Sequence, residues 1–396
     1  MVHEQRKKER IEMGKILLTT LFSGYNFGSS LQAFATKAFI GQMGHDCVLV
    51  ARKSVIRGRD IRLGKLMTIL WRTLTTADTR TLHAYRSAYS KTLSGDSAER
   101  FAAFERDCLQ PMRLSWEGLR KLASECVVCI AGSDQLWNPT SVYVDPLYYL
   151  RFAPKTKRIA FATSMGHDFV AQYNRKKLKQ WIAEVRHIAV REDSGVRLIA
   201  ELCGRDDVIQ LPDPTLLLDG DTWRKLLSPG TDGGRYILAY FLDSPSEYAR
   251  KCIRLLQEER GCEVIAIPYT HEDMSYATRI VSAGPVDFLR LVDNAVTVVT
   301  DSFHGTAFSI NMHTPFYVFD RNYGRAYSQG RRITSLLAML CLDDRHEPQM
   351  ETVNCREMDF HNADIILHRQ RLEARRWLAA AIDECIKACG TSSCGV

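Results

Sequence analysis

Short runs of apolar residues alternate with segments of helical hydrophobic spacing along most of the chain. Six runs in the first half indicate buried strands, and amphipathic stretches separate most of them. These runs are residues 15–22, 47–50, 126–130, 158–163, 187–190 and 209–211. Alternation of this kind predicts an α/β domain built on a doubly wound parallel sheet, here over residues 14–227.

A turn-rich segment, residues 228–234 (SPGTDGG), separates this series from a second one. Further strands are expected at 236–241, 263–267, 296–300 and 316–319, with helices at 248–259 and 285–292 between them. We therefore expect a second doubly wound domain over residues 235–364. Apolar positions spaced three or four apart predict a long amphipathic helix over 365–390, packing back across the domains.

Composition limits the class of protein. Of 396 residues, 45% are hydrophobic and 25% are charged, which is typical of a soluble globular protein. No run is apolar and long enough to span a bilayer, and the N-terminus lacks the apolar core of a signal peptide. The twelve cysteines are scattered rather than arranged as a disulfide framework. These features predict a cytoplasmic protein.

The net charge of +7 is concentrated near the start of the chain. Residues 1–80 contain 14 Lys and Arg against 6 Asp and Glu, whereas the remainder is close to neutral. Residues 53–100 interleave basic and apolar positions and predict a basic helical insertion. It fits a segment on an anionic membrane surface and fits an ordinary packed helix equally well. It contains no recognisable nucleic-acid docking element, so no nucleic-acid partner is expected.

The segment 296–310, VTVVTDSFHGTAFSI, changes from strand to helical spacing in the middle. Ser302 or the aspartate before it caps the helix, and Gly305 and Thr306 leave free backbone N–H groups in its first turn. His304 is therefore expected at the carboxyl end of a strand, where open α/β sheets bind ligands and a helix N-terminus favours anions. We predict that His304 is a general acid/base acting on an anionic substrate.

Two further catalytic candidates follow strands of the first domain. Arg191 offers a planar cation that can pair two oxygens of a phosphate or carboxylate. Its alternative role is a surface salt bridge with Glu192 or Asp193. His167 follows the strand end at Gly166 and is a second candidate for proton transfer.

Polar residues at the other strand ends are candidates for binding sugar hydroxyls, or for closing turns. They are Asn26, Gly28, Ser29 and Gln32 after the first strand, Ser133, Asp134 and Asn138 after the third, and Ser164 after the fourth. Trp137 could stack on a sugar ring, although a buried anchor is its commoner role. Asp213 precedes a proline, where a turn role is the default. The G-x-G-x-x-G dinucleotide fingerprint is absent after the first strand.

Taken together, these strand-end segments resemble the polysaccharide pyruvyl transferase family. The matching pieces are YNFGSSLQA at 25–33, GSDQLWN at 132–138, VREDSG at 190–195, DPTLL at 213–217, TDSFHGT at 300–306 and RRITSLL at 331–337. The resemblance implies a GT-B-like fold with the active site between two Rossmann-like domains. It also implies transfer of the pyruvyl group of phosphoenolpyruvate onto two hydroxyls of a glycan sugar, which gives a cyclic ketal. This chemistry requires neither a metal nor a further cofactor.

The sequence departs from the family at one position. Several members carry a basic residue two positions before the histidine, where this chain has Ser302. Arg325, Arg331 and Arg332 follow shortly and are candidates for the missing anion contact.

The leading hypothesis is a ketal pyruvyltransferase acting on a lipid-linked or polymeric glycan, with peripheral contact at the inner face of the membrane. One alternative is a GT-B-type glycosyltransferase that uses a nucleotide sugar. Another is a non-catalytic glycan-binding relative, which the serine at 302 brings into consideration.

Overall fold

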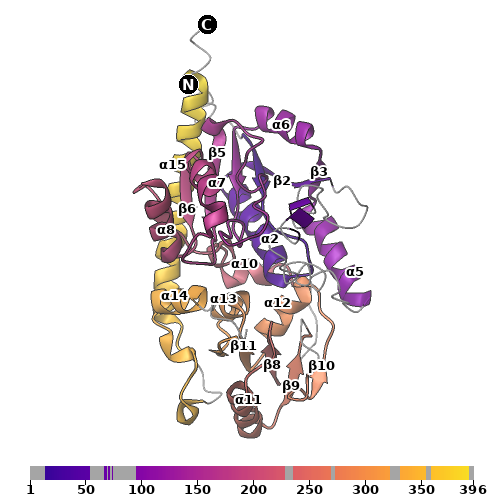
Figure 1. Ribbon diagram of the computed structural model, residues 1–396. Coiled ribbons are helices and arrows are strands. Elements are labelled where there is room, and N and C mark those ends of the chain that lie inside the picture. Colours follow the sequence, from indigo (N-terminus) through magenta and orange to yellow (C-terminus); the bar gives the residue numbers. More distant parts are fainter. Residues whose placement is uncertain are drawn as a thin grey trace, which may run out of the picture.

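The computed structural model describes residues 14–53, 67–68, 70–71, 74, 95–227, 235–268, 273–321, 331–353 and 358–391, and it contains two parallel sheets (Figure 1). The larger sheet has the strand order β3-β2-β1-β4-β5-β6-β7. Its strands are β1 (Lys15–Thr19), β2 (Asp46–Arg52), β3 (Met112–Leu114), β4 (Val128–Ala131), β5 (Arg158–Thr163), β6 (His187–Val190) and β7 (Ile209–Gln210). The order reverses between β1 and β4, so the topological switch point of this Rossmann-like sheet lies there.

The smaller sheet repeats the same plan in the order β10-β9-β8-β11-β12. Its strands are β8 (Tyr236–Tyr240), β9 (Glu263–Ala266), β10 (Arg279–Ile280), β11 (Thr297–Thr300) and β12 (Phe316–Val318). All pairings are parallel, and the switch point lies between β8 and β11. The expected α/β class with two Rossmann-like doubly wound units in a GT-B-like arrangement is therefore confirmed.

Helices connect the strands of both sheets. They are α2 (Phe27–Gln42), α5 (Gly95–Phe104), α6 (Trp116–Glu125), α7 (Gln172–Ala183), α8 (Asp193–Cys203), α9 (Pro214–Leu217), α10 (Gly220–Arg224), α11 (Glu247–Arg260), α12 (Pro285–Asp293), α13 (Phe303–Met312), α14 (Arg331–Leu340) and α15 (His361–Thr391). The last of these runs from the junction of the two halves along the larger sheet, where it packs on β4 and β5 (Figure 1). The predicted C-terminal helix is thus present, whereas the domain limits 14–227, 235–364 and 365–390 stay predictions.

The hydrophobic core joins the two halves. Along β1, Ile16 and Leu18 face a cluster that also contains side chains of the smaller sheet, and Leu17 faces a separate cluster on the other side. At the junction, Phe27 stacks on Phe288 with ring centroids 5.0 Å apart. An apolar interface of this kind restricts relative motion of the two halves.

Helix α2 begins four residues before the expected position at Leu31. Asn26 caps it, because its side-chain oxygen accepts a hydrogen bond from the Ser29 N–H at 3.0 Å. The buried side chain of Phe27 then fixes the first turn against α12. Consequently Gly28 and Ser29 lie in the first helical turn and not in the predicted loop. The edge strands β3 and β10, of three and two residues, were missed because they are too short to show a periodic pattern.

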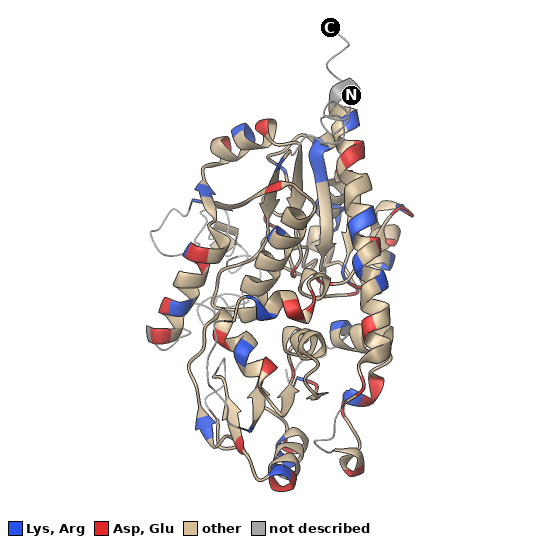
Figure 2. Cartoon of the chain, turned by 180° about the vertical axis from the view of Figure 1, so that it is seen from behind, with Lys and Arg blue, Asp and Glu red and all other residues tan. Residues whose placement is uncertain are grey.

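Most of the expected basic insertion at 53–100 lies outside the described residues. Four of its apolar residues are helical and exposed, namely Met67, Leu70, Trp71 and Leu74. Within the described part of the chain, no helix combines the length and apolarity needed to cross a bilayer. Charges of both signs are interspersed over the rear of the molecule, including α15 (Figure 2).

Candidate functional site

The two switch points face each other. Helix α2 starts after β1 at the first, and α13 starts after β11 at the second. The His304 ring at the start of α13 lies directly against Gly28 of α2. A Cβ added to Gly28 would lie 2.0 Å from His304 Nδ1 and 2.3 Å from its Cγ. The imidazole of the C-terminal half is therefore seated on the first turn of a helix from the N-terminal half.

Asp213 is the centre of the polar contacts at this junction. It follows β7 and is only 1% exposed. Its Oδ1 caps α9 by accepting hydrogen bonds from Thr215 N at 2.9 Å and Thr215 Oγ1 at 2.7 Å. Its Oδ2 accepts a hydrogen bond from Ser133 Oγ at 2.9 Å and forms a buried ion pair with Arg191 Nη1. Asp213 thus has the expected turn role through Oδ1, and through Oδ2 it also binds the Arg191 guanidinium.

Arg191 and His304 converge on the same carboxylate. His304 Nε2 lies 3.8 Å from Asp213 Oδ2, which is beyond hydrogen-bonding distance. The Arg191 guanidinium lies over the Phe303 ring, 4.5 Å from its centroid. The alternative of a surface salt bridge for Arg191 is wrong, because the side chain is buried and its partner is Asp213.

Several nitrogens here are buried without a partner among the described residues. No described residue accepts a hydrogen bond from Arg191 Nε or Nη2, and none bonds to His304 Nε2. Buried polar groups are normally paired, and leaving one unpaired costs about 1–3 kcal/mol. His304 is largely buried, with an exposed fraction of 9%. The unpaired Arg191 nitrogens act only as donors, which suits an anion.

Arg191 and Asp213 each stabilise the charged form of the other. Burial alone would raise the pKa of Asp213, but the adjacent Arg191 guanidinium holds it well below its ordinary value. Burial alone would lower the pKa of Arg191, and Asp213 raises it instead. The pair is therefore ionised at neutral pH.

A second arginine lies close to this pair. Burial, followed by the charge of Arg191, lowers the pKa of Arg332 to about 10, so it remains a cation at neutral pH. Arg332 belongs to α14 and lies within the described residues. It remains a candidate for the anion contact that Ser302 does not supply. Arg325 lies outside the described residues, and for Arg331 only the backbone is described.

Ser302, Gly305 and Thr306 shape the start of α13. Ser302 is the N-cap, and its Oγ accepts a hydrogen bond from Gly305 N at 3.3 Å. Thr306 is fully buried and its hydroxyl donates to Ser302 O at 3.0 Å. The preceding Asp301 accepts hydrogen bonds from the backbone N–H groups of Leu242 and Asp243, and so joins α13 to the end of β8. The side chains of Ser302 and Thr306 thus hold the helix start and position His304.

His167 and Ser164 lie after β5. Burial, followed by the nearby charge of Arg332, lowers the pKa of His167 from 6.5. The imidazole is half-buried and neutral at pH 7, as a proton acceptor must be. Ser164 donates its hydroxyl to Glu192 Oε1 at 3.1 Å.

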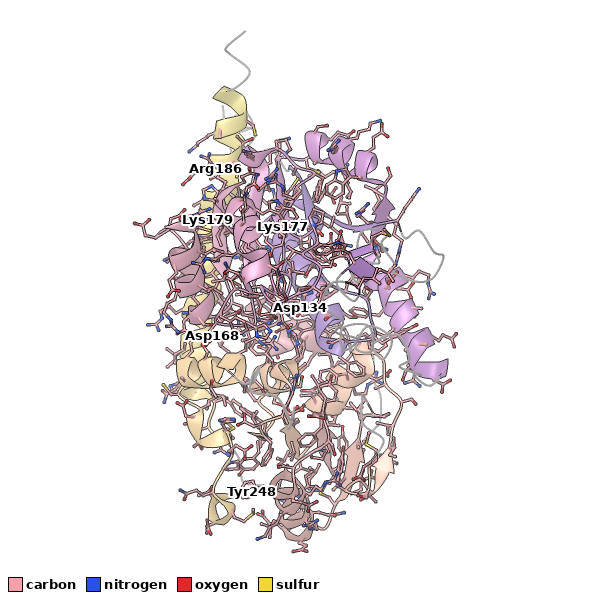
Figure 3. The ribbon with its side chains drawn as sticks, in the orientation of Figure 1. Asp134, Asp168, Lys177, Lys179, Arg186 and Tyr248 are labelled. Carbon is pink, nitrogen blue, oxygen red and sulfur yellow. The ribbon has the colours of Figure 1, made fainter. Side chains whose placement is uncertain are left out.

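The polar residues after β1 and β4 have mainly structural contacts. Gln32 is fully buried, and its amide nitrogen donates to Ser29 O at 3.0 Å and to Thr20 Oγ1 at 3.0 Å. Asn138 Oδ1 accepts from Thr140 N at 2.9 Å, which closes a turn. Ser29 Oγ donates to Asp134 Oδ2 at 2.5 Å and so links α2 to the loop after β4. Figure 3 places Asp134 near the junction of the two halves.

The predicted contact of Trp137 with a sugar ring is wrong. The indole has no exposed surface, its Nε1 donates to Tyr148 O at 2.9 Å, and it stacks on Tyr149 with ring centroids 5.2 Å apart. A tryptophan enclosed in this way is a core anchor. Sequence reasoning also missed Glu192, which is buried beside Arg191 and not exposed. The signal available was its place directly after a strand end.

In the described part of the chain, no cluster of three or more His, Cys, Asp or Glu side chains is arranged to hold a metal ion.

A family model described as polysaccharide pyruvyl transferase matches residues 26–323. The match covers the strand-end segments discussed, apart from Tyr25 of the first segment and the segment at 331–337. No curated protein matches the sequence.

Solved structures with a similar fold include a putative UDP-N-acetylglucosamine 2-epimerase from Listeria monocytogenes, at 12% identity and a TM-score of 0.44 over 90% of this chain and 95% of that one. Another is the UDP-N-acetylglucosamine 2-epimerase from Rickettsia bellii, at 10% identity and a TM-score of 0.43 over 94% and 98% of the two chains. A third is an alpha-glucosyltransferase in complex with UDP and DNA, at 10% identity and a TM-score of 0.45 over 94% of each chain.

Proposed function

Because the chain belongs to the polysaccharide pyruvyl transferase family, whose members are transferases, we propose that it moves the pyruvyl group of phosphoenolpyruvate onto two hydroxyls of a glycan sugar. The product is a cyclic ketal, and the reaction takes place in cell-surface polysaccharide biosynthesis. No cofactor beyond the donor substrate is needed.

The observation that carries this proposal is the convergence of Arg191 and His304 on Asp213 with their remaining N–H groups unpaired. Phosphoenolpyruvate has a carboxylate and a phosphate on one small carbon skeleton. A guanidinium with two unused donor nitrogens suits one of these groups as a forked partner. The His304 imidazole, at the first turn of α13, suits the other.

The chemistry assigns a proton transfer to each histidine. A protonated imidazole at His304 gives its proton to the methylene carbon, which becomes a methyl group, while a sugar hydroxyl bonds to the neighbouring carbon. That hydroxyl loses its proton to a base, for which the neutral His167 is the candidate. The second hydroxyl then displaces phosphate, and its proton restores His304, while the proton held by His167 leaves with the phosphate. Arg191 and Arg332 stabilise the negative charge on the departing phosphate.

A membrane contact is part of the proposal. Helix α7 contains four basic residues and no acidic one, and all four are exposed, namely Arg175, Lys176, Lys177 and Lys179. Figure 3 shows Lys177 and Lys179 on the larger half, with Arg186 beyond them and Asp168 nearer the junction. Such a face attracts anionic lipid headgroups or an anionic glycan. We propose a cytoplasmic enzyme that works at the inner face of the membrane on a lipid-linked or polymeric acceptor.

The transfer itself is tested by incubating the protein with phosphoenolpyruvate and a panel of glycan acceptors. Phosphate release that depends on acceptor, together with an acid-labile pyruvate on the glycan, is the expected result. His304→Ala should abolish both. Consumption of a nucleotide sugar without phosphate release from phosphoenolpyruvate would instead show a glycosyltransferase. Unchanged cellular glycans in a His304→Ala strain would point to a non-catalytic relative.

A further inference from the structure

The turn after β5 is held by one oxygen of a buried carboxylate. Glu192 Oε1 accepts hydrogen bonds from Met165 N at 2.6 Å, Gly166 N at 2.8 Å and Ser164 Oγ at 3.1 Å. The whole residue is only 3% exposed. Three donors on one oxygen leave the other oxygen free to act elsewhere. That second oxygen, Oε2, is buried and accepts no hydrogen bond from the part of the chain that the structure describes.

A second polar atom without a partner lies against the same turn. The side-chain nitrogen of Gln135, Nε2, is buried and donates no hydrogen bond to any described residue. It packs so closely on Gly166 that a Cβ there would lie 2.2 Å from it. Gly166 has φ +68°, so a side chain at this position is disfavoured by the backbone as well. The glycine therefore leaves room for the Gln135 amide beside the turn that Glu192 holds.

The chemistry of these two atoms differs from that around Arg191 and His304. There the unpaired atoms are all donors, which suits an anion. Here one is a carboxylate oxygen that only accepts and the other an amide nitrogen that only donates. A carboxylate repels an anion, whereas a hydroxyl group both donates and accepts. Neighbouring hydroxyls of a sugar would satisfy both atoms and remove the cost of leaving them unpaired.

Position links this pair to the proposed reaction. Glu192 directly follows Arg191 in the chain. Its charge acts on His167 and on Arg332, where it opposes the lowering of the pKa by burial. A hydroxyl held at Glu192 would therefore lie among the groups assigned to the donor and to proton transfer.

We infer that Glu192 and Gln135 form a hydroxyl-binding subsite for the acceptor sugar, with Glu192 Oε2 accepting a hydrogen bond from one hydroxyl and Gln135 Nε2 donating to a neighbouring one. This inference rests on the proposed function for the identity of its ligand. It adds two substrate-binding residues to those named from the sequence. The ligand class is a neutral polyol face of a sugar ring.

The variant that tests the inference is Glu192→Gln. The glutamine oxygen can keep the three hydrogen bonds that hold the turn, and its nitrogen then replaces Oε2, so an acceptor becomes a donor. Glu201→Gln is the matched control, because it makes the same exchange at an exposed position of α8. Both variants should melt within a few degrees of the wild type.

Binding is measured directly by saturation-transfer NMR with a panel of methyl hexopyranosides, alongside calorimetric titration with phosphoenolpyruvate. We expect at least one hexoside to bind the wild type and Glu201→Gln. Glu192→Gln should reduce its affinity at least tenfold, and phosphoenolpyruvate affinity should change less than threefold. Gln135→Ala should weaken hexoside binding in the same direction.

Equal hexoside binding by Glu192→Gln and the wild type would overturn the inference, as would a wild type that binds none of the panel. Failure of the proposed function is a different result. In that case hexosides bind with an affinity that depends on Glu192, but the wild type releases no phosphate from phosphoenolpyruvate with any acceptor.

Discussion

Gly28→Ala is the substitution through which the position of His304 can be tested without touching any polar group. The added methyl would lie 2.0 Å from His304 Nδ1, 2.3 Å from Cγ and 2.6 Å from Cε1. Ordinary contact begins near 3.4 Å, so the imidazole must move by about 1.4 Å. The ring cannot do this and keep its place beside Asp213.

The effects on stability and on activity should separate. Gly28 lies in α2 at a negative φ, and replacing a helical glycine by alanine stabilises a helix by up to about 1 kcal/mol. Overpacking a buried contact costs about 1–3 kcal/mol, so the net loss of stability is about 2 kcal/mol or less. A displacement of about 1 Å in a reacting group lowers the rate by about 100-fold. We therefore expect a folded protein with kcat reduced about 100-fold.

The assay is acceptor-dependent phosphate release from phosphoenolpyruvate, with thermal melting followed by circular dichroism. Gly41→Ala provides the matched control in the same helix, because an added Cβ there meets nothing within 4 Å. It should melt at or above the wild-type temperature with unchanged kcat. If Gly28→Ala is as active as Gly41→Ala, His304 either does not act in the reaction or does not lie where the structure places it.

Four further predictions concern single residues. Arg191→Lys removes the forked donors, so calorimetry should show phosphoenolpyruvate bound about 10- to 100-fold more weakly. Unchanged affinity would contradict binding of the substrate by the Arg191 guanidinium. Asp213→Asn leaves the Arg191 charge uncompensated and should lower the unfolding free energy by about 3–5 kcal/mol in urea titrations, a loss under about 1 kcal/mol being inconsistent with a buried ion pair. Burial, together with the charge of Arg332, lowers the pKa of His167 from 6.5. The neutral form of the imidazole therefore persists as the pH falls to 6.5. The acid limb of kcat/KM assigned to His167 should therefore lie below pH 6.5 and vanish in His167→Gln, whereas a His167-dependent limb above pH 7 would exclude it as the base. Trp137→Phe should cost about 2 kcal/mol of stability with acceptor KM unchanged, and a raised KM with wild-type stability would restore a sugar-binding role for the indole.

Hydrophobic patterning predicted the fold well, because parallel strands buried on both faces are nearly continuous apolar runs. The expected runs at 158–163 and 187–190 coincide with β5 and β6, and the strand before His304 differs from the expected run by one residue. The start of α2 was misplaced because Asn26 and Phe27 act through a cap and a long-range ring contact. Neither contact has a local period that a sequence pattern could reveal.

The candidate site was predictable to the extent that strand ends in parallel sheets gather at one edge. That geometry alone places Arg191 and His304 near a common crevice. It does not show which polar side chains form contacts that only maintain the fold. Trp137 is a core anchor, Gln32 is bonded to the main chain, and Asp213 is the residue that orders the site. Such roles depend on three-dimensional burial, which residue identity at a strand end does not specify.

The most direct test of the account is a calorimetric comparison of phosphoenolpyruvate with a nucleoside diphosphate on the wild-type protein and on Arg191→Lys. We predict that phosphoenolpyruvate binds the wild type more tightly than the nucleotide does, and that this preference is lost in the variant. Tighter binding of the nucleoside diphosphate, or a phosphoenolpyruvate affinity that does not depend on Arg191, would contradict a site built to hold a small phosphorylated acid between Arg191 and His304.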